Sequence, residues 1–159
     1  YASNSLSVIA NIVQTNEQHG IEVGQDRTIE RCTVIESGLD GIHVQSGCAV
    51  RDNTVLRSEQ DGIDAIGHCA IERNFVAYNG PQAGAGTNCG IQVRDVSVVD
   101  QNRTYANNNK GLSVYDVQGS IVIRNVSRHN ISNYAMSAYA GYGPVGQPGT
   151  NDSPWLNSQ

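Results

Sequence analysis

The sequence predicts an all-β parallel β-helix, in which one chain winds into about six coils of ~21 residues. Three observations lead to this fold class: two motifs that recur in phase, charges that alternate in sign at the same spacing, and a composition suited to strands and turns. The 159 residues include 17 glycines, one methionine and 6% aromatics. β-Branched residues favour strands, and glycine and asparagine favour turns. Helical bundles and doubly wound α/β folds are therefore excluded.

The first motif is a glycine followed by an apolar, a variable and an apolar residue. Its copies occupy 20–23, 41–44, 62–65, 90–93 and 111–114, in steps of 21, 21, 28 and 21 residues. A second apolar motif keeps the same phase at 8–13, 29–34, 50–55 and 71–76, with weaker copies from Val99 and Val122. Each repeat thus supplies three short apolar stretches, which stack about 4.8 Å apart as parallel strands.

Charged residues support the same register independently. Two neighbouring columns alternate in opposite order: Glu30, Arg51 and Glu72, and beside them Arg31, Asp52 and Arg73. Opposite charges on adjacent strands stabilise a sheet by roughly 0.2–1 kcal/mol, whereas like charges oppose pairing. The alternation indicates that residues 21 positions apart are neighbours in space.

Two polar columns are predicted to hold the turns. The first contains Asn11, Cys32, Asn53, Asn74, Asn102 and Asn125. The second contains Asn16, Ser37, Ser58, Asn79, Asn107 and Asn130. Stacked asparagine amides can hydrogen-bond one another along the axis while tolerating a bent backbone. We therefore assign these columns a structural role.

Three segments depart from the repeat. Most of a seven-residue insertion lies within 80–88, which we expect to protrude because glycine-rich insertions are expelled from a packed prism. Two further residues are inserted within 115–119. After Ala138 the repeat stops, and a segment with three prolines follows. We therefore expect a β-helix over 1–138 and an irregular tail over 139–159 that leaves the ladder and packs on a side or end of the solenoid.

These motifs resemble those of the right-handed parallel β-helix family, the broad group that includes pectate lyases. The Gly-Ile-x-Val coils, with 133–136 followed by a Gly/Pro-rich tail reaching Pro154-Trp155, are most similar to secreted bacterial β-helix repeat proteins. The resemblance covers nearly the whole chain. It implies a right-handed solenoid and a secreted, extracellular or cell-surface location. It singles out no activity, since members of this fold bind, cleave, epimerise or scaffold.

The candidate functional residues occupy the variable position of the first motif. This column contains Glu22, His43, Asp64, Gln92 and Ser113. Its apolar neighbours point inward, so we expect the column to point outward from one sheet. Asp40 and Asp61, each directly before a motif glycine, lie beside it. Carboxylates one coil apart repel unless a cation, a proton or His43 relieves them, so the sequence predicts an acidic patch with a histidine at its centre.

One interpretation of this patch is a catalytic site for a polysaccharide lyase, hydrolase or epimerase, with Asp61, Asp64 and His43 as catalytic residues. The segment 61–64 (Asp-Gly-Ile-Asp) resembles a polygalacturonase element, and paired carboxylates are suited to general acid–base work on sugars. The sequence shows neither the companion elements of that family nor an arginine base beside the patch.

A second interpretation is a binding face without catalysis, with Glu22, Asp40 and Gln92 contacting a glycan. Calcium is the one candidate cofactor, with Asp40 and Asp61 as ligands, because it prefers carboxylate oxygens. The third interpretation is a polar surface network with no ligand.

The cysteines leave further alternatives open. Cys48 and Cys69 are 21 residues apart, so they form either a disulfide between adjacent coils or two stacked buried thiols. Cys32 is expected to be a buried thiol, and Cys89, at the end of the insertion, is expected to be able to pair between chains. The sequence contains no Cys-x-x-Cys, which excludes zinc ribbons and dithiol redox chemistry.

The remaining histidines, His19, His68 and His129, are expected at coil corners as surface residues. Zinc needs a convergent set of ligands, and the spacing of these histidines predicts none.

Charge and hydropathy exclude two classes of partner. The net charge is −5 and Lys110 is the one lysine, so a phosphate-tracking nucleic-acid binder and a polybasic membrane patch are both excluded. No apolar run has the length of a membrane span.

The sequence therefore predicts an extracellular, non-catalytic structural or interaction module that is glycan-associated and self-assembling, the alternative being the polysaccharide enzyme described above. Tyr1 to Ser7 are too short to cap the first coil, so we expect head-to-tail stacking of copies through its open strand edges, in an oligomer or filament.

Overall fold

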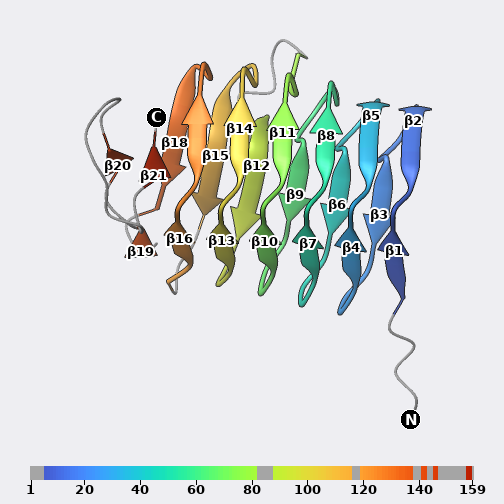
Figure 1. Ribbon diagram of the computed structural model, residues 1–159, viewed down its shortest axis with the longest axis horizontal. Coiled ribbons are helices and arrows are strands. Elements are labelled where there is room, and N and C mark those ends of the chain that lie inside the picture. Colours follow the sequence, from blue (N-terminus) through green and yellow to red (C-terminus); the bar gives the residue numbers. More distant parts are fainter. Residues whose placement is uncertain are drawn as a thin grey trace.

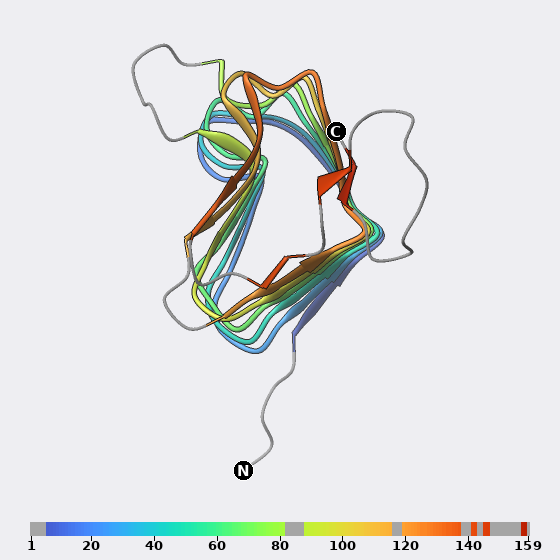
Figure 2. The same ribbon diagram turned by 90° about the vertical axis from the view of Figure 1, so that its left-hand side faces the viewer.

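The computed structural model describes residues 6–81, 88–115, 119–137, 141–142, 145–146 and 157–158. Within them the chain winds into about six coils that lie side by side along the long axis (Figure 1). Seen along that axis, the coils superimpose on a three-sided cross-section, one sheet to each side (Figure 2). The predicted all-β parallel β-helix is thus confirmed.

Each coil contributes one strand to each of three parallel sheets. Sheet A contains β1 (Ser7–Ile9), β4 (Thr28–Glu30), β7 (Ala49–Arg51), β10 (Ala70–Glu72), β13 (Val98–Asp100), β16 (Ile121–Ile123) and β19 (Gly141–Tyr142). Sheet B contains β2 (Ile12–Asn16), β5 (Thr33–Ser37), β8 (Thr54–Leu56), β11 (Phe75–Ala77), β14 (Arg103–Tyr105), β17 (Val126–Arg128), β21 (Asn157–Ser158) and β20 (Val145–Gly146). Sheet C contains β3 (Ile21–Val23), β6 (Ile42–Val44), β9 (Ile63–Ala65), β12 (Cys89–Arg94), β15 (Lys110–Tyr115) and β18 (Ser132–Met136).

The register between coils is the predicted 21 residues. Glu30 pairs with Arg51, and Arg51 pairs with Glu72. After the first insertion the partner of Ile63 is Ile91, 28 positions on, and the coils otherwise continue in phase. An insertion therefore lengthens a loop without shifting the strands that follow it.

The core is a set of apolar columns that run along the axis. In β4, β7 and β10 of sheet A only the central residue is buried, whereas β3 and β6 of sheet C bury their first and third residues. The motif glycines are required where the chain enters sheet C, because a Cβ on Gly62 would lie 2.2 Å from Val76 Cγ1. This close approach explains the glycine at the start of β3, β6, β9, β12 and β15 of sheet C.

An asparagine ladder forms the corner between sheets A and B. The residue before each ladder position has a left-handed backbone, as in Arg31 (φ 54°), Asp52 (φ 57°) and Arg73 (φ 53°). Asn53 Nδ2 donates to Ile29 O at 3.1 Å and to Asn74 Oδ1 at 3.0 Å, and the Asn53 backbone N–H donates to the same Oδ1 at 3.0 Å. Each buried amide thus joins three coils and satisfies the polar groups that the sharp turn leaves over.

The charged columns also form the expected contacts. Arg73 makes a two-pronged bond to Asp52, with Nε–Oδ1 at 2.8 Å and Nη2–Oδ2 at 3.0 Å. This bond lowers the pKa of Asp52. Glu30 lies 3.5 Å from Arg51 across the coils.

Cys48 and Cys69 are thiols and form no disulfide. Cys48 Sγ lies 3.1 Å from Gly24 O and Cys69 Sγ lies 3.1 Å from Gln45 O, each a carbonyl in the preceding coil. The two sulfurs therefore point along the axis as ladder donors, and the stacked-thiol alternative describes them. Cys32 is a buried thiol that donates to Val8 O at 3.4 Å, as expected. Cys89 is fully buried, so the expectation that it is available for pairing between chains is wrong in this fold.

Two expectations concern segments at the margins. Residues 82–87 of the insertion and 116–118 lie outside the described residues, as does most of the tail. Short tail segments nevertheless join the ladders: β19 pairs with β16 in sheet A, and β21 pairs with β17 in sheet B. The expectation that the tail leaves the ladder is therefore wrong for these segments, whose backbones continue the open sheet edges. Among the described residues no helix has the length and hydropathy to cross a bilayer.

A prediction about stability follows from the ladder. Replacing Asn74 with alanine leaves Asn53 N–H and Val50 O without their partner in the interior. We expect a loss of about 2–4 kcal/mol of unfolding free energy, measured by urea denaturation.

Asn11 provides the matched control for this prediction. It heads the same column but is exposed, and its side chain donates to Ile9 O at 3.0 Å within its own coil. Asn11→Ala is expected to cost under ~1 kcal/mol. Equal losses for the two variants would contradict the structural role of the ladder.

Candidate functional site

The site begins with the column directly before the motif glycines, which contains His19, Asp40, Asp61 and Cys89. Asp40 N–H donates to His19 Nδ1 at 3.3 Å, and Asp61 N–H donates to Asp40 Oδ1 at 2.9 Å. Cys89 N–H donates in turn to Asp61 Oδ1. These side chains perform the task of the asparagine ladder at a second corner, where sheet B leads into sheet C. One oxygen of each carboxylate is therefore committed to the backbone.

The variable column of sheet C runs beside it. Glu22 is exposed, His43 is part-buried, and Asp64, Gln92 and Ser113 are buried. The column faces away from the core in β3 and β6, as expected. Its later members are nevertheless covered, so the predicted open acidic face is closed over Asp64.

His43 lies at the centre of the site. Its Nδ1 is 3.4 Å from Asp40 Oδ2 and 3.2 Å from Asp64 Oδ2. His19 Nδ1 approaches Asp40 Oδ2 to 3.3 Å from the other side, and the two imidazole rings stack with centroids 4.8 Å apart. His43 Nδ1 is buried and forms no hydrogen bond of acceptable geometry with described residues. His19, Asp40 and His43 thus converge, and Asp64 contacts His43 from the next coil.

Arg94 and Gln92 hold Asp64 from β12. Arg94 Nη2 is 3.2 Å from Asp64 Oδ1, and Gln92 Nε2 donates to the same oxygen at 3.4 Å. The expectation that no arginine lies beside the patch is therefore wrong. Arg94 follows Gln92 by two positions, so it projects from the same face of the strand, and this period of two is the signal that identifies it.

Burial changes the protonation of two of the carboxyl groups. Desolvation raises the pKa of Asp61 to about 7, and the nearby charges of Asp40 and Asp64 add to the rise, whereas the Cys89 N–H opposes it. The pKa of Asp40 is also raised, chiefly by burial, while the Asp61 N–H and the two histidines oppose the rise. The patch is consequently less negative near neutral pH than its composition indicates.

The structure brings together most of the predicted site residues. Asp40, His43, Asp64 and Gln92 form one contact network, and Asp61 joins it through its backbone bond to Asp40. Glu22 pairs with His43 in the strand register, but its side chain is exposed. His19 belongs to the network although the sequence predicted a surface residue, and its position 21 residues before Asp40 is the signal that places it there. His19, Asp40 and His43 are close enough to hold one metal ion.

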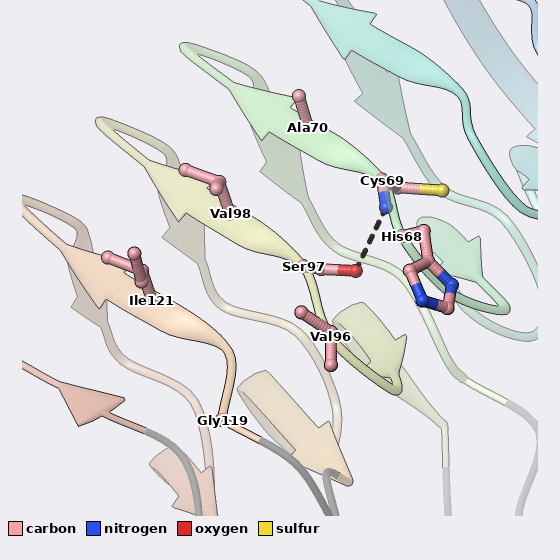
Figure 3. A pocket seen from close by; sticks show the side chains of 8 residues that line it. All are labelled: His68, Cys69, Ala70, Val96, Ser97, Val98, Gly119 and Ile121. Carbon is pink, nitrogen blue, oxygen red and sulfur yellow. Dashed lines mark hydrogen bonds between the residues drawn. The ribbon is translucent and has the colours of Figure 1, made fainter.

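A separate hollow lies at the corner where sheet C leads into sheet A (Figure 3). Ala70, Val98 and Ile121 line one side of it, on successive strands of sheet A, and Cys69 and Ser97 line the corner. Cys69 N–H donates to Ser97 Oγ at 3.1 Å. The hollow is mainly apolar and contains none of the predicted site residues.

Comparison with known proteins places this geometry in context. Residues 1–79 match the family described as "Right handed beta helix region". No curated protein matches the chain. Among solved structures, a double mutant of the periplasmic alginate epimerase AlgG superposes with a TM-score of 0.72 at 18% identity over 96% of this chain and 39% of that one. Unmutated AlgG gives a TM-score of 0.65 at 20% identity, over 96% of this chain and 38% of that one. The chain thus spans about two-fifths of AlgG, and at this identity the likeness shows the fold.

The raised pKa of Asp61 predicts how stability depends on pH. The folded state binds this proton more tightly than the unfolded state, so the contribution of Asp61 falls as pH rises from about 4 to about 7. Asp61→Asn retains an acceptor for Cys89 N–H and removes the buried charge. We expect it to raise Tm relative to the unmodified protein at pH 8 by several degrees more than at pH 5, measured by calorimetry.

Glu22→Gln removes an exposed carboxylate from the same sheet and serves as the control. It is expected to shift Tm by similar amounts at the two pH values. The same outcome for Asp61→Asn would show that the Asp61 carboxylate is not buried as described.

Proposed function

Because this chain belongs to the right-handed parallel β-helix family, we propose that it is an exported β-helix module that binds an acidic polysaccharide on the outer face of sheet C. The support comes from the groups on that face. The carboxylates of Asp40, Asp61 and Asp64 are at most 8% exposed, whereas the side chain of Arg94 is 45% exposed. The guanidinium donor is therefore exposed to solvent, whereas the carboxylates are buried.

The neighbouring strand extends this donor surface. Arg94 on β12 is the register partner of Tyr115 on β15, whose ring is exposed. Lys110 Nζ donates to Tyr115 Oη at 3.0 Å and lies 5.2 Å from the ring centroid. An exposed aromatic ring with a cation against it and another on the adjacent strand is suited to a sugar that carries carboxylates, because the ring packs on the apolar face of the sugar and the cations pair with its charge. This arrangement of Arg94, Tyr115 and Lys110 carries the proposal.

Export is part of the same proposal. The solved relatives are named as periplasmic proteins. Burial raises the pKa of the Cys48, Cys69 and Cys89 thiols, to about 12 for Cys89. A buried, protonated thiol reacts slowly with oxidants, so these cysteines are compatible with a compartment that favours disulfides.

Binding is tested with Arg94→Ala, which removes the exposed guanidinium. We expect the affinity for a soluble polyuronate such as alginate, measured by calorimetry at fixed salt, to fall about tenfold or more. Arg57→Ala is the charge-matched control, because Arg57 directly follows β8 of sheet B and pairs with Glu36 at 3.0 Å. Unchanged binding in Arg94→Ala, or an equal loss in Arg57→Ala, would contradict the proposal.

A second candidate function is proton transfer at this face, as in a lyase or epimerase. The observation that favours it is the orientation of His43: Nδ1 faces Asp40 and Asp64, so Nε2 is directed away from the carboxylates, and Arg94 lies beside Asp64. A carboxylate-oriented imidazole can exchange a proton with a bound sugar acid. The named activity of AlgG agrees with this chemistry but belongs to a protein of much greater length.

The two candidates predict different outcomes in heavy water. For the non-catalytic module we expect no deuterium at C5 of alginate or polygalacturonate after prolonged incubation, followed by NMR. For the enzyme we expect deuterium incorporation that His43→Asn abolishes. Incorporation by the unmodified chain decides in favour of the enzyme.

We also propose end-to-end stacking of copies. Strands β1, β2 and β3 each lie at the edge of their sheet among the described residues, and Ile9 and Ile12 are 42% and 74% exposed there. An edge with open backbone groups and exposed isoleucines pairs readily with another coil. A second copy of this chain supplies a strand for each edge at its opposite end.

Ile12→Lys tests this stacking, because a lysine at a strand edge opposes pairing. We expect the average mass of the unmodified chain in light scattering to rise with concentration and that of Ile12→Lys to stay monomeric. Ile66→Lys, at a mid-solenoid corner, is the control and is expected to associate normally. If the unmodified chain is monomeric at all concentrations, the stacking proposal is wrong.

A further inference from the structure

The cluster around His43 contains three residues whose potential ligand atoms lie within 4.8 Å of one another, namely His19, Asp40 and His43. Asp64 lies beside them, with Oδ2 3.2 Å from His43 Nδ1. The residues come from three successive coils, so the solenoid, and not a local sequence motif, assembles them. Asp40 and Asp64 are 5% and 4% exposed, and both histidine side chains are 19% exposed. Such a concentration of polar groups inside a protein needs compensation.

The distances between these atoms are long for charged hydrogen bonds. The three measured separations are 3.3 Å for His19–Asp40, 3.4 Å for His43–Asp40 and 3.2 Å for His43–Asp64. Charge-assisted N–H···O bonds usually measure ~2.7–2.9 Å. Four ligands placed tetrahedrally at ~2.0–2.1 Å from a zinc ion lie ~3.3–3.4 Å from one another. The spacing thus agrees with a shared central cation better than with direct pairing.

Each carboxylate is oriented by a bond to its other oxygen. Asp40 Oδ1 accepts Asp61 N–H at 2.9 Å, which leaves Oδ2 directed at the histidines. Asp64 Oδ1 contacts Arg94 and Gln92, which leaves its Oδ2 directed at His43. Such outer bonds to the far oxygen are the usual way in which proteins orient metal ligands.

An independent observation is the state of His43 Nδ1. This atom is buried and has no hydrogen-bond partner among the described residues, although two carboxylate oxygens lie within 3.4 Å. A buried ring nitrogen without a partner is costly, and a bound cation removes that cost. For His19, the bond from Asp40 N–H to Nδ1 at 3.3 Å is long and is the one contact that a cation displaces.

The geometry points to a site for a divalent transition-metal ion, with zinc as the best match, held by His19, Asp40 and His43. Two imidazole nitrogens and one carboxylate are a ligand set that zinc uses with a fourth position open to water. Asp64 lies beside this set, in contact with His43. Calcium prefers six to eight oxygen ligands, so the predicted calcium pair of Asp40 and Asp61 gives way to this set. The prediction that no zinc ligands converge is replaced as well. The site ties two neighbouring coils together and does not depend on glycan binding.

Metal titration of the metal-free chain tests the site. We expect one zinc ion to bind per chain in calorimetry, with calcium binding far more weakly under the same conditions. Cobalt(II) is expected to give the intense visible absorption of a tetrahedral complex. His19→Asn and His43→Asn are each expected to weaken zinc binding at least tenfold, whereas His68→Asn, at another corner, leaves it unchanged.

A measurement on the unmodified chain guards against variants that fail to fold. In ¹⁵N NMR of the imidazoles, zinc is expected to shift the Nδ1 resonances of His19 and His43 and not those of His68 and His129. The inference is overturned if zinc does not bind the unmodified chain, if it shifts the other histidines instead, or if folded His19→Asn and His43→Asn bind zinc normally. Loss of glycan binding in Lys110→Ala with zinc binding retained separates this site from the proposed function.

Discussion

The structure depends on the hydrogen bonds that each buried ladder side chain forms with the neighbouring coils. At the corner between sheets A and B, a ladder asparagine accepts a backbone N–H from the preceding coil and donates to a carbonyl of that same coil, as Asn74 does with Asn53 and Val50. These bonds allow a one-residue left-handed turn in the interior, because they satisfy the polar groups that the turn exposes. This turn fixes the length of the coil. Because the coil length is constant, the apolar residues of successive coils stay aligned in columns.

The same device explains the position of the candidate site. At the corner between sheets B and C, an asparagine ladder of Asn79, Asn107 and Asn130 is accompanied by a second column of titratable residues. In that column His19, Asp40 and Asp61 each accept a backbone N–H from the next coil. Titratable groups are therefore held near the surface of the solenoid, one in each successive coil. The second oxygen of Asp40 is left over and lies between His19 and His43. When its side chains are titratable, a structural ladder thus becomes a cluster that can bind ligands or transfer protons, and the solenoid holds the cluster in place.

Sequence reasoning located the fold and much of the cluster, and its failures have particular physical causes. The 21-residue register places Asp40 beside Asp61 and His43 beside Asp64, because equivalent residues in successive coils are neighbours. A lone histidine at a corner predicts a surface position for His19. Its place as the first member of the Asp40 column predicts the contact with Asp40 that the structure shows. Arg94 was missed because its contact with Asp64 joins residues 30 positions apart across an insertion. The pairing of Cys48 with Cys69 was left open, since spacing fixes the distance between two Cα atoms but not the direction of the sulfurs.

The sequence by itself determined the solenoid, its period, its ladders and the residues that share a face, because each of these follows from a repeat that needs no knowledge of side-chain direction. Only the tertiary structure decided which atoms of those residues meet. It turned the carboxylates of Asp40 and Asp64 inward, exposed the guanidinium of Arg94 and buried Cys89. These outcomes depend on rotamers and on desolvation, which packing sets and a periodic pattern does not encode.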